Sequence, residues 1–228
     1  MVGDTQTRGR RWPMSNPSFD RSTMEFGRSL SFFDAIYAFA ITLLVTNVDP
    51  PPASSWASLH TLWNSNLPGH LFGFVLSFVV IAVYWRVNFR VIGSMALMSH
   101  RLIVWNITAA FFIILIPFTT QGTSDPNTSG LPLPTALYAL NIALASLSQT
   151  AIYVSARKHG LTHTEEDKGK TGLGQLLSFL TVPVVFLASI PVTLLAGADA
   201  GRLVWATLFV INPLAGKFLS ASAARRAP

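Results

Sequence analysis

The sequence contains no cysteine, and charged side chains make up only 11% of its 228 residues. The absence of cysteine excludes disulfides, thiolate metal sites and cysteine nucleophiles. A soluble domain carries about a quarter charged residues, whereas half of this chain is hydrophobic. The composition therefore favours an integral membrane protein.

The residue patterns of common enzyme sites are also missing. The sequence has no Walker loop, no GxSxG elbow and no paired-carboxylate site. Its five histidines lack metal-ligand spacing such as HExxH and fall near predicted helix ends or loops. We therefore predict that the protein is not an enzyme and has no resident metal or cofactor.

The sequence does contain apolar runs that are long enough to cross a bilayer, which takes about 20 residues of helix. Six segments qualify: Arg28–Val48, Leu67–Ile92, Ala96–Thr120, Pro134–Ala156, Leu173–Ala196 and Arg202–Ala223. They predict an all-α, polytopic membrane protein with six helices over residues 28–224. Ser54–Asn64, which contains Trp56 and Trp63, is expected to form a short helix at the outer interface, where tryptophan rings prefer to lie.

Positive charge is concentrated between alternate helices. Of the 16 Lys and Arg residues, only Arg202 falls in an outer loop, and the other fifteen lie on the opposite side. Because cytoplasmic loops are enriched in Lys and Arg, both termini are predicted to be cytoplasmic. The net charge of +6 is thereby explained without a nucleic acid partner. Residues 1–27 are interpreted as a disordered cytoplasmic arm, and residues 225–228 as a cytoplasmic tail.

Asp34 is the one acidic residue inside a predicted span. An ionisable group at that depth is costly unless it is paired, which makes it a functional candidate. The favoured interpretation is a structural lock, in which Asp34 pairs with Arg28 of a neighbouring helix or subunit, or with Arg86 or Arg90. A direct role in ion conduction is the alternative.

Polar residues elsewhere in the spans have two interpretations. Asn106, Asn141 and Asn212 are explained by hydrogen bonds between helices. Spacing along the first helix places the hydroxyls of Thr42 and Thr46 on one face with small or bulky apolar residues, namely Ala35, Ala38 and Phe39, with Leu43 beside them. Such a stripe suits close helix packing, which periodicity favours, or the lining of a narrow pore.

The stretch from Arg28 through Phe32, Phe33 and Asp34 to Thr42-Leu43-Leu44 resembles the first-helix signature of the transmembrane protein 175 family of potassium channels. That signature reads Arg, three variable residues, Phe-Ser-Asp, then an apolar run that ends in Thr-Leu-Leu. Ser77 to Trp85 is similar to the end of the second helix of the family, and Trp105-Asn106 through Pro117-Phe118 is similar to its third.

The resemblance implies a homotetramer in a bacterial plasma membrane, with helix 1 of each subunit lining a pore for K⁺ and other monovalent cations. It places the constriction and the pore lining at Phe39, Thr42, Leu43 and Thr46. It also implies a structural network of motif residues, in which Arg28, Phe32 and Asp34 lie at the cytoplasmic end and Trp85 and Asn106 are further members. Membrane lipid is the other expected partner.

Four positions depart from the family pattern. Phe33 replaces its Ser, Phe39 replaces the constricting Ile, and Asn88-Phe89 replace a His pair. A ring of Phe39 side chains would close a dry constriction more tightly than Ile. Besides a passive potassium-permeable channel, two functions stay open: a proton-coupled secondary transporter that uses Asp34, and a non-conducting structural membrane protein.

Overall fold

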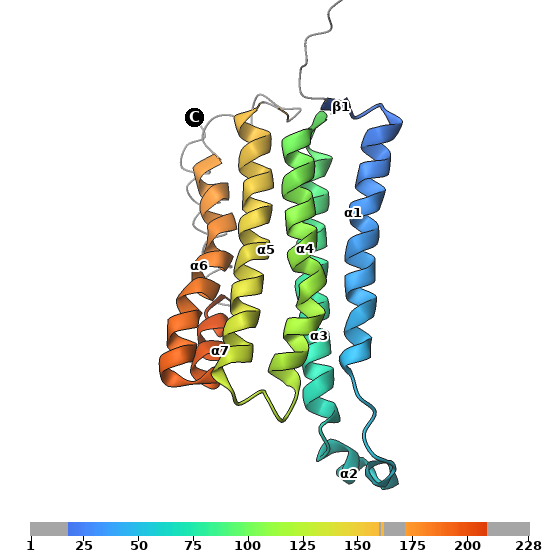
Figure 1. Cartoon of the computed structure of the whole chain (residues 1–228), viewed down its shortest axis with the longest axis vertical. Coiled ribbons are helices and arrows are strands. Elements are labelled where there is room, and N and C mark those ends of the chain that lie inside the picture. The colour runs from blue at the N-terminus through green and yellow to red at the C-terminus, as the bar shows by residue number, and fades with distance from the viewer. Residues whose placement is uncertain (1–17, 160, 162–171, 209–228) are drawn as a thin grey trace, which may run out of the picture.

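The computed structural model describes residues 18–159, 161 and 172–208. In this part of the chain, long helices of alternating direction form an all-α bundle (Figure 1). The long helices are α1 (Met24–Leu43), α3 (Leu67–Gly93), α4 (His100–Ser124), α5 (Pro132–Lys158) and α6 (Gly172–Ala196). The short elements are β1 (Ser18–Asp20), η1 (Leu44–Asn47), η2 (Ala53–Ala57), α2 (Leu59–Trp63), β2 (Leu97–Ser99) and α7 (Ala198–Ala206).

Five segments of the described chain are long and apolar enough to cross a membrane, by length and composition. They correspond to the first five predicted spans. The predicted sixth span, Arg202–Ala223, lies mostly outside the described residues. Its beginning differs from the prediction, because α7 starts at Ala198, so that Gly197 alone separates it from α6. Gly197 has φ 94°, a left-handed conformation that favours glycine.

The segment before α1 is ordered from residue 18, so the prediction of a disordered arm is wrong for residues 18–27. β1 pairs antiparallel with β2, which places Phe19 opposite Met98. Helix α1 begins at Met24, four residues earlier than predicted, because the hydroxyl of Thr23 accepts a hydrogen bond from the backbone N–H of Phe26 and caps the helix. Residues 1–17 lie outside the described part.

The prediction that helix 3 starts at Ala96 is wrong as well. Leu97–Ser99 form β2, and α4 begins at His100 because the Ser99 side chain caps it. β1 and β2 lie together at one end of the bundle, called here the β1 end (Figure 1). The opposite end carries η2 and α2 and is called the α2 end. The short helix predicted over Ser54–Asn64 is present there as these two pieces.

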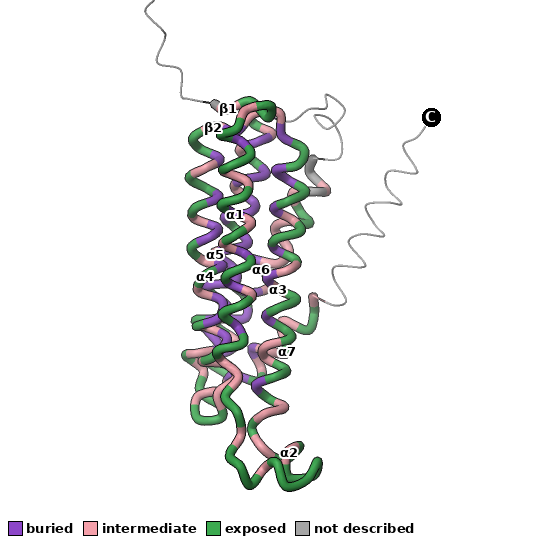
Figure 2. Tube along the Cα trace, turned by 90° about the vertical axis from the view of Figure 1, so that its right-hand side faces the viewer, coloured by how far each residue is buried: buried purple, intermediate pink, exposed green. Residues whose placement is uncertain are grey.

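Helix α5 is the most enclosed of the long helices, and α1 is among the most exposed. Of the most apolar 18-residue window of each helix, 67% is buried in α5 and 22% in α1. Helix α1 lies at one edge of the bundle, packed against α3 and α4, with α6 and α7 at the opposite edge (Figures 1 and 2). One face of α1 is therefore left uncovered by its own subunit.

Hydrogen bonds made by side chains tie the long helices together, as predicted for Asn106 and Asn141. Asn88 donates to Asn106 at 2.8 Å, and Asn141 donates to the carbonyl of Phe112 at 3.1 Å. Asn212 lies outside the described residues. Gln149 on α5 donates to the hydroxyl of Tyr37 on α1 at 2.7 Å. These bonds provide acceptors for amide N–H groups that cannot bind water inside a bilayer. The side-chain oxygens of Asn141 and Gln149 are buried and accept no hydrogen bond from the described residues.

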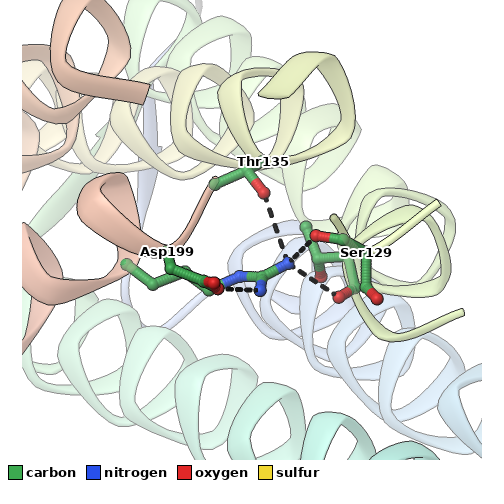
Figure 3. Close-up of polar contacts among 5 residues, drawn as sticks. Ser129, Thr135 and Asp199 are labelled. Atoms are coloured by element: carbon green, nitrogen blue, oxygen red, sulfur yellow. Dashed lines mark hydrogen bonds and ion pairs between the residues drawn. The ribbon is translucent and has the colours of Figure 1, made fainter. Parts of the chain in front are cut away.

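Arg202 fastens helix α7 to the end of α4 and to the loop between α4 and α5. The guanidinium of Arg202 donates to Asp199 at 2.9 Å, to the carbonyl of Thr123 at 3.2 Å and to the carbonyl of Ser129 (Figure 3). The hydroxyl of Thr135 lies 3.4 Å away. The one arginine predicted for an outer loop therefore has a structural role at the α2 end.

Candidate functional site

The uncovered face of α1, together with its continuation in η1, is called the α1 stripe. It consists of residues that are all exposed and recur every three to four positions: Phe32, Ala35, Ala38, Phe39, Thr42, Leu43 and Thr46. Phe39 is 69% exposed and Leu43 is 45% exposed. The structure therefore places all four predicted pore residues on one uncovered face.

The rotation of α1 is fixed by its opposite face. Phe33, Tyr37, Ala40 and Leu44 follow helical spacing and are all buried. The hydroxyl of Tyr37 is held by Gln149, and the amide of Asn47 donates to the carbonyl of Pro117 on α4 at 2.6 Å. The buried apolar side chains and these two hydrogen bonds lie on the same face of the helix. Rotation that turned the α1 stripe inward would therefore expose those side chains and break the hydrogen bonds.

The α1 stripe differs in composition from the other uncovered faces of the bundle. The exposed residues of α3 and α4 are mostly bulky and apolar, for example Phe72, Val75, Val79, Val83, Ile107, Phe111, Ile114 and Phe118. Such side chains suit contact with lipid. The α1 stripe instead alternates bulky residues with alanine and threonine, which lets another helix approach closely.

The two threonines of the stripe satisfy their own donors. The hydroxyl of Thr42 donates to the carbonyl of Phe39 at 2.9 Å, and that of Thr46 to the carbonyl of Leu43 at 2.7 Å. Each hydroxyl oxygen keeps its capacity to accept or to coordinate. The α1 stripe therefore offers oxygen atoms at two levels, close to the apolar side chains of Phe39 and Leu43.

Nearer the β1 end, Asp34 is paired with another member of the implied motif network and not with any of the three arginines named as its partners. The indole Nε1 of Trp85 on α3 donates to Oδ1 of Asp34 at 2.9 Å. Within the described residues Asp34 forms no ion pair with Arg28, Arg86 or Arg90, all of which are exposed. The contact supports a locking role for Asp34 and leaves its pairing with Arg28 of another subunit a prediction.

The other members of the predicted network are placed separately. Asn106 pairs with Asn88, and its amide also donates to the carbonyl of Leu102 at 2.9 Å. Phe32 contacts the ring of Phe33, with centroids 5.6 Å apart. Sequence reasoning missed Asn88 as a partner, although an amide within an apolar run is itself a signal of a bond between helices.

The segment that contains the first-helix motif also matches a known protein family. Residues 28–117, which contain most of α1, all of α3 and most of α4, match the family model described as endosomal/lysosomal potassium channel TMEM175. The resemblance predicted from the first helix is thereby confirmed over this region.

Several curated bacterial proteins are similar to the chain. A potassium channel of Chryseobacterium sp. is 27% identical over 57% of this chain and 64% of its own length. A potassium channel of Streptomyces collinus is 25% identical over 75% of this chain and 87% of its own length. One from Chamaesiphon minutus is 32% identical over 42% of this chain and 48% of its own length. The chain thus spans less than two thirds of the first and third of these relatives.

Two solved structures share the fold. The crystal structure of a lysosomal potassium-selective channel TMEM175 homologue from Chamaesiphon minutus has a TM-score of 0.56 and 21% identity, over 88% of this chain and 98% of that one. A crystallised variant of the potassium channel MtTMEM175 has a TM-score of 0.62 and 17% identity, over 93% of this chain and 99% of that one. The bundle is therefore of the type seen in these channel structures.

Proposed function

We propose that the chain forms a potassium-permeable cation channel, in which the α1 stripes of a homotetramer line a central pore. The observation that carries the proposal is the α1 stripe itself, a face with alanine and threonine that its own subunit leaves uncovered. The match of residues 28–117 to a potassium channel family supports it, as do the relatives named as potassium channels.

Conduction would be passive and limited by a hydrophobic neck. Phe39 and Leu43 from each subunit would narrow the pore, and an apolar neck gates by expelling water. An ion that passes it sheds part of its hydration shell, which costs less for K⁺ than for Na⁺. The hydroxyl oxygens of Thr42 and Thr46 would offset part of that cost. Selectivity then follows from dehydration rather than from a carbonyl cage.

We infer from the distribution of charge which end of the bundle faces the cytoplasm. Among the described residues, the Lys and Arg side chains at the β1 end are Arg21, Arg28, Arg86, Arg90, Arg101, Arg157 and Lys158, against Arg202 at the α2 end. This asymmetry supports a cytoplasmic β1 end and an outer α2 end in a bacterial plasma membrane. A sixth span that completes residues 202–223 would return the C-terminus to the cytoplasm.

The test is current through purified protein in a planar bilayer with K⁺ on one side and Na⁺ on the other. Discrete current steps that reverse towards the K⁺ equilibrium potential are expected. Flux without unitary steps, limited by turnover, would overturn the proposal in favour of a carrier. Absence of current and flux from protein shown to be folded and tetrameric would overturn it in favour of a non-conducting protein.

A further inference from the structure

One uncovered face of α3 changes from apolar to positively charged along its length. Its exposed apolar residues recur every three to four positions: Phe72, Val75, Val79 and Val83. Arg86 and Arg90 continue the same spacing and are also exposed. Because residues three and four apart lie one above another on a helix, all of these side chains share one face. This face, called here the α3 face, is apolar for about three turns and ends in two guanidinium groups at the β1 end.

The length of α3 places these two arginines at the level of the lipid headgroups. Its 27 residues extend for about 40 Å, which matches the thickness of a bilayer with its headgroup regions. The apolar part of the α3 face then lies against acyl chains, and the last two turns reach the phosphates. The rings of Trp85 and Phe89, with centroids 5.7 Å apart, lie at the same level as the arginines. Aromatic side chains are enriched at this depth.

The two guanidinium groups are not used by the subunit itself. Within the described residues, Arg86 and Arg90 form no ion pair and donate no hydrogen bond. Other arginines of the β1 end are engaged: Arg21 donates to two backbone carbonyls between α3 and α4, and Arg101 lies 3.2 Å from a ring nitrogen of His159. Like charges one helical turn apart repel each other. The α3 face therefore favours an anion that binds both arginines together.

The acidic residues described at this end do not provide that anion. Asp34 is held by Trp85, Oδ1 of Asp20 accepts from Ser22, and Glu25 lies in the first turn of α1, where the helix dipole stabilises it. A second copy of the chain suits the α3 face poorly. It would bring the same positive charges, and the α3 face lacks the alanine and threonine that let the α1 stripe approach another helix closely.

We propose that Arg86 and Arg90 bind the phosphate of an anionic phospholipid, whose acyl chains lie along Val83 and Val79. Guanidinium N–H groups pair with phosphate oxygens, and clusters of Lys and Arg beside membrane helices attract anionic headgroups. A zwitterionic lipid fits less well, because its ammonium group would approach the arginines and be repelled. The inferred orientation makes the leaflet cytoplasmic. The site needs a bundle embedded in a membrane but no ion conduction, so bilayer currents do not decide it.

The first test compares two lipids on the unaltered chain. Purified full-length protein in detergent is titrated with phosphatidylglycerol or with phosphatidylcholine of the same acyl chains, and bound lipid is counted by native mass spectrometry. Phosphatidylglycerol should bind about 25-fold more tightly, about fivefold for each arginine at the headgroup level. Inorganic phosphate should not displace it, because it gains nothing from the apolar part of the face. Equal binding of the two lipids, or displacement by inorganic phosphate, overturns the proposal.

The second test locates the site. Arg86→Gln and Arg90→Gln should each weaken binding of phosphatidylglycerol about fivefold and leave binding of phosphatidylcholine unchanged. Lys158→Gln is the matched control, because it removes an exposed positive charge from the same end but on α5, which packs mainly between α4 and α6. It should change binding of phosphatidylglycerol less than twofold.

Two results of the second test would overturn the proposal. Equal losses in all three variants would assign the preference to the overall charge of the β1 end. Dissociation of the assembled subunits in Arg86→Gln or Arg90→Gln, with the lipid preference unchanged, would show that another copy of the chain covers the α3 face. If neither arginine variant folds, the comparison of lipids on the unaltered chain still decides whether an anionic lipid is preferred.

Discussion

The indole N–H of Trp85 on α3 donates to the carboxylate of Asp34 on α1 at 2.9 Å, and so joins the edge helix to its neighbour. A hydrogen bond to a charged group contributes about 1.5–3 kcal/mol. Both partners are only partly buried, with Trp85 41% exposed, so the lower part of this range applies.

Replacing Trp85 by phenylalanine should destabilise the protein by about 1.5 kcal/mol more than the matched control, because the N–H donor is lost together with part of the ring, and the control loses the ring area alone. The measurement is thermal unfolding in detergent. Trp105→Phe is the matched control, since Trp105 is 40% exposed and its indole makes no hydrogen bond in the described structure. Equal losses in the two variants would show that the Asp34 bond contributes nothing of its own.

Asp34→Asn separates a channel from a proton-coupled carrier. Asparagine keeps an acceptor oxygen for Trp85 but cannot exchange a proton, so we expect a folded protein that retains passive K⁺ current. A carrier that uses Asp34 as its protonatable site would instead lose transport completely. The measurement is K⁺ flux into liposomes, together with bilayer current, for protein of confirmed folding.

Phe39→Ala should raise the single-channel conductance or weaken the preference for K⁺ over Na⁺, because it widens the proposed neck and lowers the cost of keeping water there. The structure offers a control of equal exposure. Phe118 on α4 is also 69% exposed but lies outside the α1 stripe, so Phe118→Ala should leave conduction unchanged.

Leu43→Ala is expected to act in the same direction as Phe39→Ala, since Leu43 lies one helical turn further along the stripe. Unchanged currents in both variants, with folding and assembly confirmed, would contradict the assignment of the α1 stripe to the pore. A change in Phe118→Ala of the same size would show that the effect comes from altered packing or lipid contact.

Arg202→Lys should destabilise the α2 end by about 1.5–3 kcal/mol, because a lysine ammonium cannot reproduce a guanidinium that reaches the carbonyls of Thr123 and Ser129 together. Unfolding in detergent measures the loss. Asp199→Asn is the control: the side chain of Asp199 is 94% exposed, and an exposed ion pair contributes about 0–1 kcal/mol. A loss in Asp199→Asn as large as in Arg202→Lys would assign the effect to the ion pair.

Part of the candidate site could be predicted from the sequence because it depends on helical spacing. Helical spacing alone puts four residues on one face: Phe39, Thr42, Leu43 and Thr46. The motif that begins at Arg28 identified the helix that carries them. Their assignment to a pore remains a prediction, which Phe39→Ala and Leu43→Ala test.

Other parts depend on contacts between distant segments. Asp34 meets Trp85 across 51 residues, and no local pattern of residues specifies this approach of α1 to α3. The strand formed by Ser18–Asp20 was missed for the same reason, because three residues have little propensity of their own and are ordered by pairing with Leu97–Ser99.

The sequence by itself determined that the protein is a bundle of membrane helices. It also determined the positions of the five membrane-length helices in the described chain, and which end of the bundle carries the positive charge. These properties depend on the length of each apolar segment and on the composition of its flanks, because each segment must match the bilayer by itself. Only the tertiary structure decided that α1 lies at the edge with the α1 stripe uncovered, that Trp85 holds Asp34, and that Arg202 joins α7 to the carbonyls of Thr123 and Ser129. Those relationships arise from side-chain packing between helices. The packing depends on two segments at once, so the sequence of one segment does not specify it.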